Sequence, residues 1–202
     1  MKNKIIKDAL ALTLITLVAG VALGGVYEIT KDPIAKQEAQ AKAEAYEQVF
    51  TDAAAFEEVE MDDTLIQTIR DQLDQEGYKA QSIEEVMRAE DQSGETLGYA
   101  FTVVTSEGYG GDIQFSMGVQ NDGTLNGISI LSIGETAGLG MNADTPAFKD
   151  QFVGKQVEKL QYTKNGATQD DEINAISGAT ITSNATTNAV NAALYYLHNC
   201  LN

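Results

Sequence analysis

The chain has 202 residues, and its 30 acidic residues outnumber its 13 basic ones to give a formal net charge of −17 at pH 7. Nucleic-acid binding is excluded, because phosphates would have to approach against the protein's own field. One cysteine and one histidine exclude an internal disulfide and are too few for an ordinary zinc site. Any redox chemistry would therefore need a bound cofactor, and the length suits one domain plus an anchor.

An uncharged segment occupies residues 9–27, which are all apolar, small or threonine. At a rise of about 1.5 Å per residue, this run is about as long as the apolar core of a bilayer is thick. It predicts a transmembrane helix. A cleaved signal peptide is the alternative, although the run is longer than the usual signal core of about 7–15 residues.

The charges on the two flanks of this segment predict its orientation. Lys2, Lys4 and Lys7 lie before it, whereas acidic residues enter the flank after it, at Glu28 and Asp32. The positive-inside rule then leaves residues 1–8 in the cytoplasm. Everything after residue 27 is predicted to lie outside the cell membrane.

Two helices are predicted to follow the anchor, so that residues 28–80 form a stalk and helical segment. Asp32 followed by Pro33 is typical of a helix start, and small and aromatic residues follow at helical spacing. A second helix is predicted from about Asp63 to Glu76, with Gly77 as its C-terminal stop.

Strands and one last helix are predicted in residues 81–202. Three pairs of strand-like segments each enclose a turn signal, which predicts three hairpins: 82–89 with 97–105, 112–119 with 124–131, and 157–163 with 172–176. A helix is predicted from about Ser183 to Asn199, with an apolar stripe that must pack on the sheet. The expected class is α+β, an antiparallel sheet of hairpins packed with helices.

The segment from Asn174 to Ser183 runs from a strand through a turn of small residues into this last helix. Free N–H groups and the positive end of the helix dipole make such a turn a natural phosphate site. Its hydroxyl residues are more simply explained as ordinary helix caps, which are common before a helix. From the residues alone, both interpretations stay open.

Ser177-Gly178-Ala179-Thr180, followed by Ile-Thr-Ser, resembles the flavinylation motif of an FMN-binding domain. This domain is shared by the G subunit of Rnf complexes and the C subunit of Na⁺-translocating NADH:quinone reductases. The resemblance implies covalent FMN, esterified through its phosphate to Thr180, which makes this residue a phosphoryl threonine. It also implies FMN contacts at Ser177, Gly178, Ala179 and Thr182. The family pattern begins with Asp, where this chain has Asn174.

Two further segments are similar to loops of the same family. Residues 134–140 read Gly-Glu-Thr-Ala-Gly-Leu-Gly, similar to a Glu-Thr-Pro-Gly-Leu-Gly loop that lies against the flavin, and residues 108–111 read Gly-Tyr-Gly-Gly. Taken alone, each is a glycine-rich turn. The resemblance implies FMN contacts at Glu135, Thr136, Gly138, Leu139, Gly140, Tyr109 and Gly110.

These motifs occur in the family's order over nearly the whole chain, and the modest length favours the Rnf subunit. The resemblance implies an electron-transfer subunit of a membrane-bound, ion-translocating ferredoxin:NAD⁺ oxidoreductase complex, with the other subunits and a flavin transferase as partners. Neither a catalytic acid, base or nucleophile nor a metal site is expected. The alternatives are a stand-alone exported flavoprotein, a C subunit of the quinone reductase, and an anchored module that carries no flavin.

Overall fold

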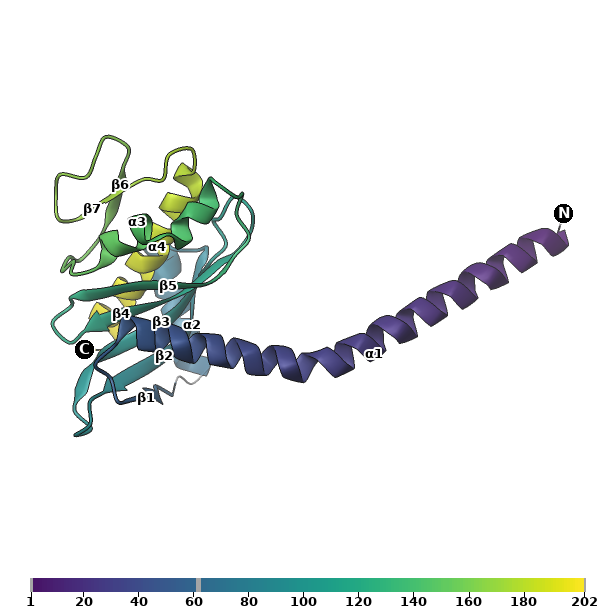
Figure 1. Ribbon diagram of the computed structural model, residues 1–202, viewed down its shortest axis with the longest axis horizontal. Coiled ribbons are helices and arrows are strands. Elements are labelled where there is room, and N and C mark those ends of the chain that lie inside the picture. Colours follow the sequence, from purple (N-terminus) through teal and green to yellow (C-terminus); the bar gives the residue numbers. More distant parts are fainter. Residues whose placement is uncertain (1, 61–62, 202) are drawn as a thin grey trace. The chain divides into compact units, whose positions relative to one another are not determined.

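The computed structural model describes residues 2–60 and 63–201 (Figure 1). Its helices are α1 (Lys2–Val49), α2 (Asp63–Gln75), α3 (Pro146–Lys149) and α4 (Thr180–Tyr196). Its strands are β1 (Ala55–Glu58), β2 (Gln81–Glu90), β3 (Thr96–Thr105), β4 (Ile113–Gln120), β5 (Leu125–Ile133), β6 (Gln161–Thr163) and β7 (Glu172–Asn174). Short 3₁₀ turns lie at Gly140–Asp144 and Asp150–Phe152, and a π turn at Leu197–Leu201 follows α4. The chain divides into two compact units after Ala41.

Helix α1 joins two helices that the sequence predicts separately. Among the described residues, it is the one helix long and apolar enough to cross a membrane, with a mean hydropathy of 2.3 in its most apolar window. The predicted helix start at Asp32 is wrong, because α1 continues through Pro33. A proline inside a helix costs about 3 kcal/mol, and the alanine-rich sequence that follows it favours continuation of the helix.

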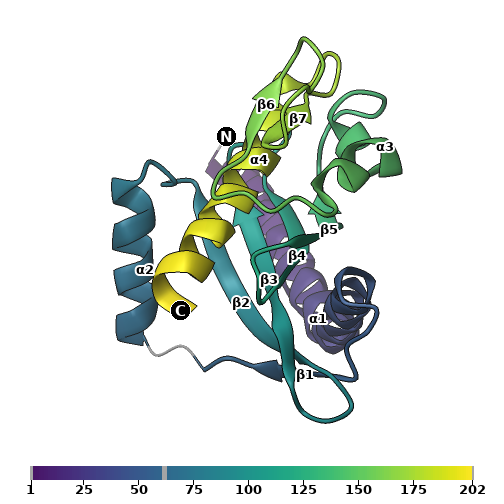
Figure 2. The ribbon, with the colours of Figure 1, turned by 90° about the vertical axis from the view of Figure 1, so that its left-hand side faces the viewer.

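Strands β1 to β5 form one antiparallel sheet in sequence order, which confirms the first two predicted hairpins. Alternate residues of each strand point to opposite faces. On one face, Val86, Phe101, Met117 and Ile128 form a row across four strands and belong to the main core. Helices α2 and α4 lie on this face (Figure 2). The predicted α2 is confirmed, with Ile69 and Leu73 buried.

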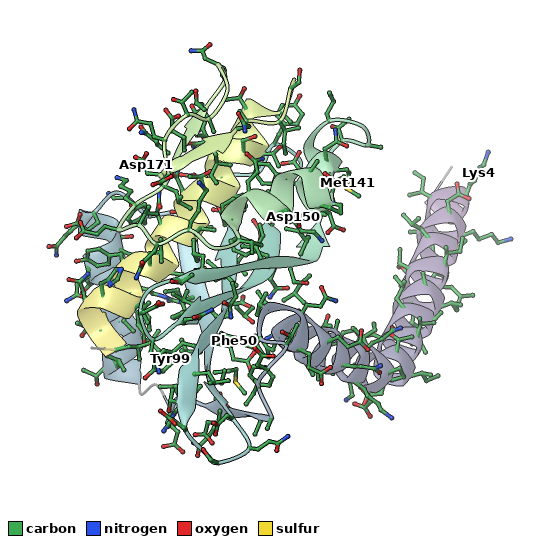
Figure 3. All side chains as sticks on the ribbon, turned by 60° about the vertical axis from the view of Figure 1, so that its left-hand side comes forward. Lys4, Phe50, Tyr99, Met141, Asp150 and Asp171 are labelled. Atoms are coloured by element: carbon green, nitrogen blue, oxygen red, sulfur yellow. The ribbon has the colours of Figure 1, made fainter. Side chains whose placement is uncertain are left out.

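The other face of the sheet is covered by the end of α1, from Lys42 to Val49, and by Phe50, which follows it (Figure 3). Beneath it, Glu85, Thr102, Ser116 and Ser129 are paired in register across four strands, and we call them the polar row. Three polar contacts join α1 to this row: Lys42 Nζ to Glu85 Oε2 at 2.8 Å, Tyr46 OH to Thr102 Oγ1 at 2.6 Å, and Ser129 Oγ to Gln48 Oε1 at 2.9 Å. The last two turns of α1 are therefore part of the folded domain.

The third predicted hairpin is wrong, because β6 and β7 pair in parallel. Its turn signal, Asn165-Gly166, lies instead in a longer loop, whose backbone is held by hydrogen bonds to two side chains. The Glu172 carboxylate accepts hydrogen bonds from the Thr168 and Gln169 N–H groups, and the first of these is the main cause that lowers the pKa of Glu172. Asn174 Oδ1 accepts a bond from Ala167 N–H at 2.6 Å. These bonds hold the loop together, and β7 after it runs in the same direction as β6.

Helix α4 begins three residues before the predicted start, at Thr180 rather than Ser183. Its apolar stripe packs on the sheet as expected, and Val190, Leu194 and Leu197 are buried. The early start matters for the site, because it makes Thr180 the first helical residue, with Ala179 at the N-cap.

Candidate functional site

Three segments meet at one end of the large sheet. Thr105 at the end of β3 pairs with Ile113 at the start of β4, which in turn pairs with Ile133 at the end of β5. The loops that leave these strand ends, 106–112 and 134–140, are therefore neighbours. The first turn of α4 completes the group.

A cavity of about 610 Å³ lies between these segments. It is lined by Tyr109, Glu135, Thr136, Leu139, Gly140, Gly178, Ala179, Thr180, Ile181 and Thr182. Most of the predicted contact residues are thus brought together, from three distant parts of the chain. Ser177, Gly138 and Gly110 are not in the lining, although each is next to a residue that is. Ile181 lines the cavity but was not predicted; its signal was its place inside the motif.

The hydroxyl residues around α4 differ in their availability. Thr180 lines the cavity and is partly exposed, whereas Thr182 lines it with only 1% of its surface exposed. Ser177 is exposed but outside the lining. Thr180 is therefore the hydroxyl residue of the motif that combines a position in the cavity wall with access from outside.

Ser183 has a structural use that its place in the motif did not reveal. Its buried Oγ accepts a hydrogen bond from Ile176 N–H and donates one to the Ala179 carbonyl, both at 2.9 Å. These bonds tie the first turn of α4 to the turn before it. They hold Thr180 at the cavity wall without using the Thr180 hydroxyl.

The first turn of α4 has N–H groups available for an anion. In the described part of the chain, no side chain caps this helix, and Ser183 N–H is the first to bond within it, to the Ala179 carbonyl at 3.1 Å. The N–H groups of a first turn and the helix dipole attract phosphate. The lining contains no lysine or arginine, and Glu135 is its only charged side chain. Backbone groups would therefore hold a phosphate here, and a covalent bond would secure it.

The residues present fit a flavin mononucleotide. The volume falls within the range of about 300–1,000 Å³ found for small-molecule sites. Tyr109, Leu139 and Ile181 give apolar surface for a planar ring, and they are respectively 73%, 44% and 51% exposed. Gly140 keeps part of the wall free of a side chain, since a Cβ there would lie 2.7 Å from Thr182 Oγ1. Apolar surface suited to a planar ring and N–H groups suited to a phosphate thus lie beside the same cavity.

Comparison with known proteins places the chain in a family. Residues 108–195 match the family described as FMN-binding domain, and residues 1–49 match the RnfG N-terminal region. The chain is 33% identical over 197 residues to the G subunit of the Na⁺-translocating ferredoxin:NAD⁺ oxidoreductase complex of Acetobacterium woodii, covering 96% of this chain and 92% of that protein. It is 30% identical to the G subunit of the ion-translocating oxidoreductase complex of Methanosarcina acetivorans, covering 96% of this chain and 95% of that one.

A solved structure shares the fold. The C subunit of the Na⁺-translocating NADH-quinone reductase from Parabacteroides distasonis matches with a TM-score of 0.51 and 23% identity, over 72% of this chain and 76% of that chain. Sequence similarity to G subunits, in contrast, extends over nearly the full length of both partners. The chain belongs to the family of G subunits of Rnf ion-translocating oxidoreductase complexes.

Proposed function

We propose that this chain is the electron-carrying subunit of a membrane-bound, ion-translocating ferredoxin:NAD⁺ oxidoreductase complex, with FMN esterified through its phosphate to Thr180. The observation that carries the proposal is the position of Thr180. Its side chain stands where an uncapped helix N-terminus meets a cavity with apolar walls. The names of the full-length relatives support the assignment to such a complex.

When bound, the flavin supplies the ring that accepts and releases electrons. The residues of this chain hold and orient that ring. The first turn of α4 would bind the phosphate, Tyr109, Leu139 and Ile181 would give apolar surface for the ring, and loop 134–140 would form the adjoining wall through Glu135, Thr136 and Gly140. No side chain of the lining is assigned an acid, base or nucleophile role during turnover.

Attachment forms a bond between the Thr180 Oγ1 and the FMN phosphorus and breaks the pyrophosphate bond of a flavin dinucleotide, so that the nucleoside monophosphate leaves with the proton of the threonine. A flavin transferase catalyses this transfer. We expect protein coexpressed with such a transferase to gain the mass of FMN less one water, and fragmentation of the tryptic peptide to place that mass on Thr180. The band of the intact protein should also stay fluorescent after denaturing electrophoresis. An unmodified Thr180 in that sample, or modification of another hydroxyl residue, would contradict the proposal.

The proposal includes an orientation, with residues 1–8 in the cytoplasm and the flavin domain outside the cell membrane. Cys200 is the only cysteine, so Cys200→Ser provides a background for single-cysteine labelling. Gln92 is exposed in the β2–β3 turn, and Ile5 is exposed near the N-terminus. An impermeant maleimide is expected to label Gln92→Cys in intact spheroplasts and Ile5→Cys only after permeabilisation. The reverse labelling pattern would exclude this orientation.

Permanent attachment suits an exported carrier, because free FMN that dissociates there would be lost. The alternative of a stand-alone flavoprotein shares the same cavity and the same threonine. Copurification distinguishes the two, since a member of a complex is expected to bring other membrane and redox subunits with it when purified from its host in mild detergent.

A further inference from the structure

Glu135 is a buried acidic residue with a defined partner inside the protein. It is 8% exposed, and its Oε1 accepts a hydrogen bond from the Tyr109 backbone N–H at 2.8 Å. The two residues lie 26 positions apart in the chain. Glu135 thus links the loop after β5 to the loop after β3.

The carboxyl group also lies close to a glycine of each loop. A Cβ at Gly108 would lie 3.1 Å from Oε1, and a Cβ at Gly140 would lie 2.7 Å from Oε2. The same added atom at Gly140 would lie 2.7 Å from Thr182 Oγ1, on the first turns of α4. Glu135 therefore lies where the two loops and the first turn of α4 meet.

The hydrogen bond to Tyr109 N–H lies in a loop whose backbone is costly to order. Residues 108–111 contain three glycines, which lose more conformational freedom on ordering than other residues do. A hydrogen bond to a carboxylate is shorter and stronger than one between neutral groups. Meanwhile the Tyr109 ring is 73% exposed at the cavity wall, so its place depends on the backbone that carries it.

We infer that Glu135 is a positioning residue: it accepts the Tyr109 N–H, orders the loop of residues 108–111 before any flavin is bound, and so places the Tyr109 ring against the flavin. The contact with flavin rests on the proposed function, whereas the ordering of the loop does not. The inference adds to the expected FMN contact at Glu135, because it gives Oε1 a partner within the protein.

Two substitutions of Glu135 test whether the oxygen that accepts the Tyr109 N–H is what orders the loop. Glu135→Gln keeps an oxygen acceptor for Tyr109 N–H, whereas Glu135→Ala removes it. Glu158 is an exposed glutamate outside the site, and Glu158→Ala is the matched control. The first measurement is amide hydrogen exchange of the peptide that spans residues 108–111, in the full chain expressed without a flavin transferase.

Glu135→Ala is expected to speed exchange of this peptide about tenfold to a hundredfold, the range given by loss of one hydrogen bond to a charged group. Glu158→Ala should exchange like the wild type, and Glu135→Gln should lie between the wild type and Glu135→Ala, because a neutral oxygen accepts a weaker hydrogen bond. Exchange of the paired strands β2 and β3 should be the same in all four proteins, which excludes a general loss of stability. Wild-type exchange in Glu135→Ala, or exchange in Glu135→Gln as fast as in Glu135→Ala, would overturn the inference.

The second measurement uses the fluorescence of the attached flavin, since a phenol in contact with an excited flavin ring quenches it. Tyr109→Phe keeps the ring but removes the phenol, and its flavin is expected to be brighter than the wild type. Glu135→Ala should be as bright as Tyr109→Phe although it retains Tyr109, and Glu135→Gln should stay quenched. A Glu135→Ala protein that stays quenched beside a bright Tyr109→Phe would overturn the positioning role. An unmodified Thr180 would instead defeat the proposed function and leave the exchange result standing.

Discussion

Thr180→Ala is expected to abolish covalent flavin completely. The substitution removes the only motif hydroxyl that combines a place in the cavity wall with exposure. Alanine is the most favourable residue in a helix, and the Thr180 hydroxyl makes none of the hydrogen bonds that hold this turn, so the fold should be unchanged. Intact mass and in-gel fluorescence after coexpression with a flavin transferase measure the loss.

Two neighbouring substitutions provide controls for this result. Thr182→Ala is expected to keep covalent flavin, because the Thr182 side chain is only 1% exposed and is not the acceptor of the phosphate. Ser177→Ala should keep it as well, since Ser177 lies outside the lining. FMN retained in Thr180→Ala would show that another hydroxyl carries the flavin.

Gly140→Ala is expected to produce the second-largest effect, a cavity that no longer accepts flavin. The added Cβ would lie 2.7 Å from three atoms, which belong to Glu135 and Thr182. One of these atoms is the Glu135 Cβ, which is attached directly to the backbone, so the clash can be relieved only by a shift of the backbone. Overpacking of this kind costs about 1–3 kcal/mol of unfolding free energy. We expect a lower midpoint of thermal unfolding and the loss of most flavin loading.

Gly134→Ala is the matched control in the same loop. A Cβ at Gly134 would meet only the Gly110 carbonyl oxygen, at an ordinary contact distance of 3.5 Å. This variant should therefore unfold near the wild-type temperature and load flavin normally. If Gly140→Ala loaded as well as Gly134→Ala, the close packing of Glu135 and Thr182 around Gly140 would have no part in forming the site.

Much of the fold could be predicted because local patterns and the final packing agree. The two strong hairpins and α2 carry periodicity that also matches their buried faces. The third predicted hairpin was wrong. Asn165-Gly166 is a local turn signal, whereas hydrogen bonds to the side chains of Glu172 and Asn174 determine the path of the loop. The predicted helix start at Asp32 was wrong for a related reason, since a proline is typical of a helix start but can also be accommodated inside a long helix, as Pro33 is in α1.

Which residues form the candidate site could be predicted from the sequence, but the structural roles of these residues could not. Family motifs identified Thr180 and both glycine loops. The bond from Tyr109 N–H to Glu135 joins segments 26 positions apart, and no local pattern encodes such a pair, because it forms only when the strand ends meet. Ser183 bonds locally, to Ile176 and Ala179, but a motif serine could equally have faced a ligand, so its structural role was visible only in the structure.

The polar row beneath α1 determines where a soluble form of the domain can begin. A gene shortened to start at residue 81 would delete the helical turns that cover this face, together with β1 and α2. The hydroxyls of Thr102 and Ser129 would then lose Tyr46 and Gln48, at about 1–3 kcal/mol for each that stays buried. A start at Lys42 retains both partners and the ion pair with Glu85.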